Sequence, residues 1–326
     1  MRKITYAEAI NETLYQLIAG DPRVFLIGQG VTSPWYVGST TVGLVSKFGA
    51  KRIIDTPTSE NGMTGIALGA ALAGMHPILC YPRMDFMYYA MDQIANHIAN
   101  WHYMFGGQLS APVTLWSIIN RGGEQAAQHS QATHAIFAHL PGLKVVAPST
   151  PYDAKGLLSA SVREENPVVF VDDRWLYQQL GEVPEELYTV PIGKGIIRRE
   201  GRDVTIVATS YMVVEATKAS DSLEKEAIHV EVVDLRSLKP LDTNLLFSSV
   251  KKTKRLIIAD GGWKTGGFGA EISAKVGESS IYNSLKAPIM RISVPDAPAP
   301  ASSALEKVYY PTSESLVSAA RHILER

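Results

Sequence analysis

The chain has 326 residues, enough for two domains of ordinary size, and hydrophobic residues make up 46% of it. Its 31 lysines and arginines nearly balance its 32 aspartates and glutamates, so the formal net charge at pH 7 is −1. This balance creates no positive field for nucleic acid or an anionic membrane surface, and we expect small molecules or other proteins as partners.

No segment of the sequence has the character of a membrane span. The longest nearly apolar run, residues 65–75, is shorter than the roughly 20 residues that cross a bilayer. The first residues contain no apolar core of signal-peptide length. The single cysteine, Cys80, excludes an internal disulfide and lies in an apolar segment, which favours a buried thiol. We therefore expect a soluble cytoplasmic protein with no membrane contact.

Apolar runs and amphipathic stretches alternate along the first half of the chain. Continuous apolar runs predict buried strands, and the stretches between them have the spacing of helices. The expected strands are 23–28, 52–54, 77–81, 113–118, 144–147 and 167–171, and the expected helices are 5–18, 42–48, 62–74, 88–102, 130–139 and 151–163. This order predicts a parallel sheet covered by helices on both faces.

The alternation stops at residue 172 and resumes at residue 203. Glycine, proline and acidic residues mark 172–201 as an extended linker. The strands expected beyond it are 204–208, 229–234, 255–259 and 288–293, and the helices are 213–225, 242–252, 270–276 and 313–324. The prediction is an α/β protein of two domains, residues 1–186 and 187–326, each a mostly parallel sheet sandwiched by helices.

Polar residues gather in the loops that follow the strands of the first domain. In open parallel sheets, ligands bind beyond the carboxyl ends of the strands. The loops expected at that edge carry Gln29, Glu60, the segment 83–86 and the segment 120–129. We therefore expect these loops to converge on one site.

Glu60 lies in the segment D-T-P-T-S-E-N-G-M-T-G, residues 55–65, just before the expected small-residue helix 62–74. Acidic residues are favoured there by the helix dipole and the free N–H groups of the first turn. The helix that follows is nearly all small and apolar and offers no nearby cation. The residues alone therefore leave two interpretations open for Glu60: a structural helix cap, or a carboxylate with a role in function.

His129 follows the glycines Gly122 and Gly123, which allow unusual backbone angles, and precedes a helix expected to begin after Ser130 as N-cap. A helix N-terminus disfavours the charged imidazolium, so His129 would be neutral and able to exchange a proton near pH 7. A loop histidine is also often merely solvated or hydrogen-bonded. Both interpretations remain open from spacing alone.

Several segments, in order along essentially the whole chain, have the sequence of a known family. They are D-T-P-T-S-E-N-G, D-Q-I-A-N with Y-M-F-G-G-Q, Q-H-S-Q, H-L-P-G-L-K-V-V-A-P-S-T-P-Y-D-A-K-G-L-L and G-W-K-T-G-G-F-G-A-E-I. Together they closely resemble the β subunit of E1 of the 2-oxo acid dehydrogenase complexes. That group includes the pyruvate, branched-chain and acetoin dehydrogenases and belongs to the transketolase-like thiamine diphosphate enzymes.

The resemblance implies a definite organisation. The first domain would be a transketolase-like pyrimidine-binding domain and the second a transketolase C-terminal-like domain. The chain would pair with an α subunit in an α2β2 assembly with contact between β subunits, and the α subunit would carry the diphosphate and Mg²⁺ site. A lipoyl-bearing E2 would be the further partner.

The resemblance also implies roles for particular residues. Glu60 would hydrogen-bond N1′ of the aminopyrimidine ring of thiamine diphosphate, favouring the imino tautomer that takes the C2 proton. Phe86 would pack on that ring, with Pro82 and Tyr89 in the same cofactor loop. His129 would face the substrate and lipoyl side.

Some members of the family bind K⁺ through backbone positions. These positions would correspond to Val113, Ser161, Val162, Glu164 and Asn166. Because such contacts are mostly carbonyl oxygens, the side chains at these positions say little about K⁺ binding.

The sequence departs from the family where the substrate is expected. Gln29 stands where the family usually has an acid, and Arg83 stands where uncharged residues are more common. A guanidinium suits a carboxylate or a phosphate, which makes Arg83 and Gln29 candidate substrate contacts. Arg83 could equally pair with Asp85 or with a partner chain.

The resemblance predicts oxidative decarboxylation of a 2-oxo acid with transfer of the acyl group to lipoyl-E2, through catalytic Glu60 and His129. One alternative is a subunit of a split transketolase-like enzyme that moves a ketol unit between sugars. In that case Arg83 would bind a phosphate group of the substrate. Another is a non-catalytic binding or docking subunit, because the chain lacks the diphosphate and Mg²⁺ motif. The sequence does not specify which 2-oxo acid is used.

Overall fold

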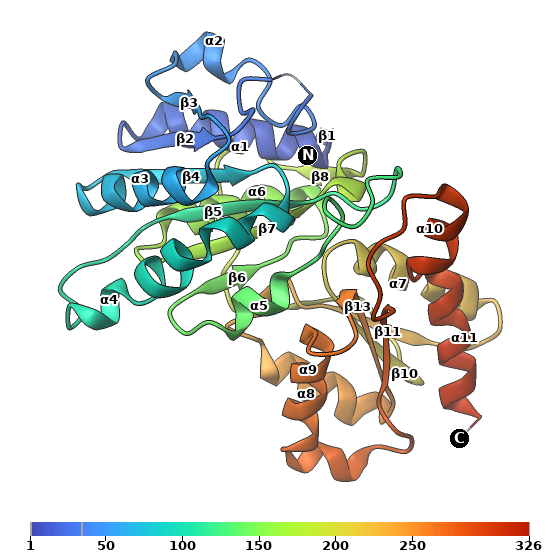
Figure 1. Cartoon of the computed structure of the whole chain (residues 1–326). Coiled ribbons are helices and arrows are strands. Elements are labelled where there is room, and N and C mark those ends of the chain that lie inside the picture. Colours follow the sequence, from blue (N-terminus) through green and yellow to red (C-terminus); the bar gives the residue numbers. More distant parts are fainter. Residues whose placement is uncertain (1, 34, 326) are drawn as a thin grey trace. The chain divides into compact units, whose positions relative to one another are not determined.

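The computed structural model describes residues 2–33 and 35–325 (Figure 1). The chain divides into two compact units. Unit 1 consists of Met1–Arg121, His129–Gln131 and Phe137–Ile192, and unit 2 of Gly122–Gln128, Ala132–Ile136 and Gly193–Arg326. The two-domain α/β prediction is confirmed, while the boundary between residues 186 and 187 stays a prediction.

Unit 1 is built on a parallel sheet with the strand order β6, β7, β5, β4, β2, β3. Its strands are β2 (Val24–Gly28), β3 (Ile53–Asp55), β4 (His76–Tyr81), β5 (Thr114–Ile119), β6 (Lys144–Val146) and β7 (Val168–Asp173). Most of their residues are buried, as expected for strands covered on both faces. Cys80 on β4 is buried and unpaired, which confirms the predicted structural thiol.

The helices of unit 1 begin where the sequence supplies caps. The capping box of Thr5 and Glu8 starts α1 (Tyr6–Gly20), and Thr150 caps α6 (Pro151–Arg163), which has proline at its first position. The remaining α-helices that begin in this part of the chain are α2 (Leu44–Phe48), α3 (Glu60–Leu72), α4 (Trp101–Met104) and α5 (His134–His139).

The single helix predicted for residues 88–102 is wrong. This stretch contains the end of a 3₁₀ helix η1 (Met84–Ala90), a π-helix η2 (Asp92–Ile98) and the start of α4. Met84, Met87 and Ile94 are fully buried, so packing rather than helix propensity sets the backbone here. Short 3₁₀ and π segments often mark functional regions.

The stretch 172–201 is not the extended linker that its composition predicted. It contains the end of β7, the 3₁₀ turn η3 (Arg174–Leu176), β8 (Leu180–Val183) and β9 (Ile196–Arg199). β8 pairs antiparallel with β1 (Arg2–Thr5). Most side chains of this two-stranded ribbon are at least partly exposed, so it lacks the apolar run by which strands are predicted.

Unit 2 has a second sheet with the order β14, β13, β10, β11, β9, in which only the pairing of β9 with β11 is antiparallel. The sequence missed β9, β12 and α10. The elements beyond β9 are β10 (Val204–Ala208), α7 (Tyr211–Glu224), β11 (Val230–Asp234), β12 (Ser237–Lys239), α8 (Thr243–Thr253), β13 (Leu256–Trp263), α9 (Phe268–Gly277), η4 (Ser280–Ser284), β14 (Met290–Val294), α10 (Ser303–Tyr309) and α11 (Ser313–Leu324).

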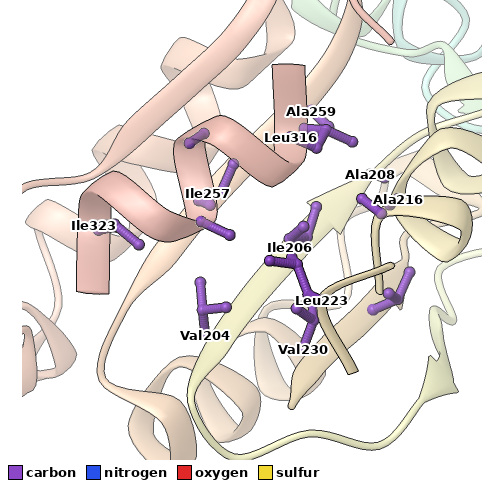
Figure 2. Close-up of a cluster of buried hydrophobic side chains, with 14 of the residues drawn as sticks. Val204, Ile206, Ala208, Ala216, Leu223, Val230, Ile257, Ala259, Leu316 and Ile323 are labelled. Atoms are coloured by element: carbon purple, nitrogen blue, oxygen red, sulfur yellow. The ribbon is translucent and has the colours of Figure 1, made fainter. Parts of the chain in front are cut away.

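The core of unit 2 lies between its sheet and the helices α7 and α11 (Figure 2). Ile206 of β10 and Ile257 of β13 are fully buried there, and Leu223 of α7 and Leu316 of α11 cover them. Burying each such side chain stabilises the fold by about 1.5–3 kcal/mol. In the described ranges, no helix has both the length and the apolar character that a membrane crossing requires.

Candidate active site

Glu60 is the first residue of α3, which begins two residues earlier than predicted. The preceding N-cap, Ser59, makes no side-chain cap hydrogen bond. Glu60 is only 8% exposed, and within residues 2–33 and 35–325 its carboxylate has no hydrogen-bond or ion-pair partner. The structure therefore does not show Glu60 as a cap. Its carboxylate oxygens are not among the buried polar atoms of the described residues that lack a partner, so they can be reached by solvent or by a ligand that carries a donor.

Thr64 and Tyr81 lie beside Glu60. The hydroxyl of Thr64 donates to the backbone carbonyl of Glu60 at 2.5 Å and is 2.5 Å from the phenol oxygen of Tyr81. Burial, with a smaller contribution from the charge of Glu60, raises the pKa of Tyr81 well above its ordinary value. Tyr81 therefore lines this site as a neutral, protonated phenol.

Phe86 and His129 come together although they lie in separate segments. Their ring centroids are 5.2 Å apart and their planes are nearly perpendicular, at 87°. Tyr89 lies against the other side of this group, 6.4 Å from Phe86, and is 71% exposed. Pro82, at the end of β4, is buried. η1, which carries Phe86, packs against α3, the helix that begins at Glu60. The assignment of these residues to one site stays a prediction.

His129 is not at a helix N-terminus, contrary to the prediction. Ser130 caps no helix, because α5 begins only at His134. The pKa of His129 is nevertheless lowered, first by burial and then by the positive charge of Arg83. The expected neutral imidazole thus stands, but a helix dipole is not its cause.

The loop before His129, residues 122–128, has an unusual backbone. Gly123 has a φ of 65°, as its glycine predicted, but Glu124 and Ala126 also adopt positive φ values, 60° and 59°. Such values are uncommon for residues with side chains and often occur at functional sites. Glu306 of α10 accepts a hydrogen bond from the Glu124 N–H at 2.9 Å and so holds this conformation.

The ion pair between Arg83 and Asp85 is not formed. Arg83 donates to the carbonyl of Pro82 at 2.7 Å, and its guanidinium carbon lies 5.9 Å from the centroid of the Tyr36 ring. Asp85 accepts from the backbone N–H of Gln131 at 3.1 Å. Burial raises the pKa of Asp85 to about 6.

Gln29 belongs to the same neighbourhood through Tyr36. Its side-chain amide donates to the Tyr36 hydroxyl at 3.2 Å. The start of this loop is fixed by Asp55 at the end of β3, which accepts from the N–H groups of Gly30 at 2.8 Å and Thr32 at 3.3 Å. A Cβ on Gly30 would lie 2.0 Å from the Tyr36 ring, so the position of the ring depends on that glycine.

Comparison with known proteins gives the family. The model of the transketolase pyrimidine binding domain matches residues 2–179, and that of the transketolase C-terminal domain matches residues 193–316. The chain is 41% identical over 335 residues to acetoin:2,6-dichlorophenolindophenol oxidoreductase subunit beta of Bacillus subtilis, covering 99% of this chain and 98% of that protein. It is 39% identical over 326 residues to pyruvate dehydrogenase E1 component subunit beta of the same organism, covering 100% of both. The chain belongs to the transketolase-like E1 β subunits.

This E1 β subunit also resembles a solved structure described as a split gene transketolase, an inactive beta4 tetramer. The TM-score is 0.81 at 24% sequence identity, with 99% of this chain and 98% of that chain covered. This likeness concerns the fold. The family and fold predicted from the sequence motifs are thus confirmed.

Two residues of the site were not found from the sequence of this E1 β subunit. Tyr36 contacts both Gln29 and Arg83: its hydroxyl accepts from the Gln29 amide, and the Arg83 guanidinium lies over its ring. Arg174 of η3 donates a hydrogen bond to the Tyr36 carbonyl. Arg174 directly follows β7, so it lies at the sheet edge where functional loops are expected. Its position directly after a predicted strand could have identified Arg174 as a candidate site residue from the sequence.

Proposed function

We propose that the chain is the β subunit of a thiamine diphosphate-dependent 2-oxo acid dehydrogenase E1. The observation that carries this proposal is the mostly buried Glu60 at the start of α3, the helix against which η1 packs, together with the contact of Phe86 of η1 with His129. In the reaction a 2-oxo acid loses CO₂, and its remaining acyl group passes to a lipoyl group of E2. The lipoyl disulfide is reduced, so that one sulfur carries the acyl group and the other becomes a thiol.

The residues present fit the pyrimidine end of the cofactor. When bound, thiamine diphosphate supplies the carbanion chemistry of decarboxylation. Glu60, which is mostly buried, would share a hydrogen bond with N1′ of the pyrimidine, and that bond would give its carboxylate a donor. Phe86 provides an apolar face for the ring, and Pro82 and Tyr89 border it.

His129 moves a proton at the reacting oxygen of the substrate. Its lowered pKa keeps the imidazole neutral at pH 7, so one ring nitrogen can accept a proton while the other donates one. The nearly perpendicular contact with Phe86 holds the orientation of the imidazole ring. General acid and base catalysis of this kind contributes about 10²–10⁴ in rate.

The remaining parts of the enzyme come from partners. The described residues contain no cluster of three or more His, Cys, Asp or Glu side chains that could hold a metal ion. We assign the diphosphate and Mg²⁺ site to an α subunit in an α2β2 assembly with contact between β subunits, and the acyl acceptor to the lipoyl domain of E2. We expect the complex in the cytoplasm.

K⁺ binding through the backbone of Val113, Ser161, Val162, Glu164 and Asn166 stays a prediction from family resemblance. The carbonyl of Val162 is 3.2 Å from Nδ1 of His76, and that of Val113 accepts from the N–H of Val168 at 3.1 Å. A carbonyl oxygen has two lone pairs, so these hydrogen bonds leave acceptor capacity for a cation.

The test is reconstitution of the chain with an α subunit encoded beside it. The assay measures 2-oxo acid consumption with 2,6-dichlorophenolindophenol as electron acceptor, with and without thiamine diphosphate and Mg²⁺. The proposal predicts turnover that requires both chains and the cofactor. Turnover of sugar phosphates instead would identify the split ketol transferase, and no turnover with either substrate class would favour the binding subunit.

A further inference from the structure

Two guanidinium groups contact the same residue at the carboxyl edge of the first sheet. Arg83 follows β4 and lies over the ring of Tyr36, with 5.9 Å between its guanidinium carbon and the ring centroid. Arg174 follows β7 and donates a hydrogen bond to the Tyr36 carbonyl. The charge of Arg174 also acts on Arg83, which places the two cations near each other.

Neither cation is balanced by an ion pair. Over residues 2–33 and 35–325, neither Arg83 nor Arg174 has a carboxylate within ion-pair distance, and the Nε of each is buried without a hydrogen-bond partner. Guanidinium groups in the described residues are satisfied in different ways: Arg236 donates to the backbone carbonyls of Lys194 and Gly195, while others pair with a carboxylate. Arg121, for example, forms a buried ion pair with Asp173, directly before Arg174 in the chain. Arg83 and Arg174 thus lack a carboxylate partner although a buried ion pair lies next to Arg174 in the chain.

No ion pair joins Arg83 or Arg174 to the carboxyl groups of Asp85 and Asp172, which act on them electrostatically. Asp85 and Asp172 act on the arginines only through space, and burial raises their pKa values to about 6 and about 7. Asp172 is therefore only partly ionised near neutral pH, while Asp85 is mostly ionised there. Burial and Arg174 together lower the pKa of Arg83. Two like charges in a partly desolvated position cost free energy, and proteins retain such arrangements chiefly at functional sites.

The pair belongs to the neighbourhood of the candidate active site. Arg83 is close enough to His129 to lower its pKa, and Gln29 donates to the hydroxyl of Tyr36. The hydrogen-bond donors in this group are the guanidinium groups of Arg83 and Arg174, the side-chain amide of Gln29 and the phenol of Tyr36. Guanidinium groups bind carboxylate and phosphate through paired N–H donors, which an ammonium group cannot match in geometry.

We infer that Arg83 and Arg174, held by Tyr36, bind an anionic group that the substrate carries in addition to its reacting carboxylate. The inference rests on the proposed function and gives it a substrate class, a 2-oxo acid with a second carboxylate or a phosphate-like group. The reacting carboxylate is a poor ligand for this pair. It must leave as CO₂, and tight binding of its charge would stabilise the ground state rather than the transition state.

The test compares substrates in the reconstituted α/β complex with the dye as electron acceptor. Pyruvate has no second anion, 2-oxoglutarate has a second carboxylate, and 2-oxo-4-phosphonobutanoate has a phosphonate. The inference predicts that kcat/KM for at least one dianionic substrate exceeds that for pyruvate at least tenfold. The better of the two identifies the anion as a carboxylate or a phosphate-like group.

The variants are Arg83→Met and Arg174→Met, with Arg163→Met as control because Arg163 is an exposed arginine at the end of α6. Each of the first two should lower the ratio of kcat/KM for the preferred dianion to that for pyruvate at least tenfold, and the control should leave it unchanged. The ratio cancels any effect of Arg83 on His129 that both substrates share. Calorimetry of the complex with succinate and inorganic phosphate gives a second readout, and both variants should weaken the binding seen in the unchanged protein.

The inference is overturned if no dianionic substrate is preferred, or if the ratio is the same in all three variants. Either result would mean that a partner chain or solvent balances the two arginines. The proposed function is tested separately by Glu60→Gln in the same assay with pyruvate. Loss of turnover in that variant together with an unchanged ratio in the arginine variants would reject the substrate class and keep the dehydrogenase.

Discussion

The imidazole of His129 meets the ring of Phe86 edge to face, with 5.2 Å between centroids and 87° between planes. His129 follows a loop with positive φ values and Phe86 lies on a 3₁₀ helix, so neither residue is held by an α-helix or a β-strand. Their contact couples the side chain proposed to move a proton to the side chain proposed to hold the cofactor ring. Predictions about either residue therefore depend on the loops that hold them.

The charge of Arg83 should set the acid limb of the pH profile. Burial, and after it the positive charge of Arg83, lowers the pKa of His129, which extends the neutral form of the imidazole toward lower pH. In Arg83→Met the repulsion is gone, the pKa rises, and a larger fraction of His129 is protonated at pH 6. NMR titration of the His129 ring should show this rise. An unchanged titration would show that Arg83 does not act on His129.

Glu306 should control the loop before His129. Removing its carboxylate in Glu306→Ala takes away the acceptor of the Glu124 N–H, a hydrogen bond of 2.9 Å. A lost hydrogen bond to a charged group costs about 1.5–3 kcal/mol, so amide exchange in residues 122–128 should accelerate roughly tenfold or more. Hydrogen exchange measured by mass spectrometry checks this, with the exposed Glu314→Ala as control. Equal protection in both variants would contradict the role of Glu306.

Asp172 should make the protein less stable as the pH rises. It is fully buried, and Trp116 and Tyr177 donate to its Oδ2 at 3.0 Å and 2.7 Å. Burial raises its pKa from 3.8 to about 7. At pH values between 3.8 and about 7, Asp172 is protonated in the folded protein and ionised in the unfolded chain. The free energy of unfolding therefore falls as the pH rises through this range.

Asp172→Asn imitates the protonated acid and should remove this part of the pH dependence. Relative to the unchanged protein, its free energy of unfolding should rise between pH 5 and pH 8 by at least about 1 kcal/mol. Urea denaturation at several pH values measures this, with the exposed Asp92→Asn as control. Parallel curves for the unchanged protein and Asp172→Asn would refute the raised pKa.

Much of the fold could be predicted because its strands are continuous apolar runs. Helix α6 and strand β10 match their predicted bounds, since a capped amphipathic helix and a fully buried strand carry clear sequence signals. The ribbon of β1 and β8 was missed because its side chains face solvent and follow no apolar period. Tertiary packing overrode helix propensity in η1 and η2.

The candidate site was predicted in part. Glu60, Phe86 and His129 were identified through the family motifs, and the contact between Phe86 and His129 agrees with their assignment to one site. Tyr36 and Arg174 were not, because no motif marks them and their contacts join segments far apart in the sequence. Because α5 begins only at His134, His129 is not at a helix N-terminus. Burial, rather than a helix dipole, is the main cause of its lowered pKa.

The most direct test of the central claim is the rate of deuterium exchange at C2 of thiamine diphosphate bound to the α/β complex. If Glu60 activates the pyrimidine, Glu60→Gln should slow this exchange by about 10²–10⁴, the range of general acid and base catalysis, while the assembly and its cofactor content stay intact. Exchange in Glu60→Gln within a few-fold of the unchanged complex would contradict the account, whatever the overall turnover.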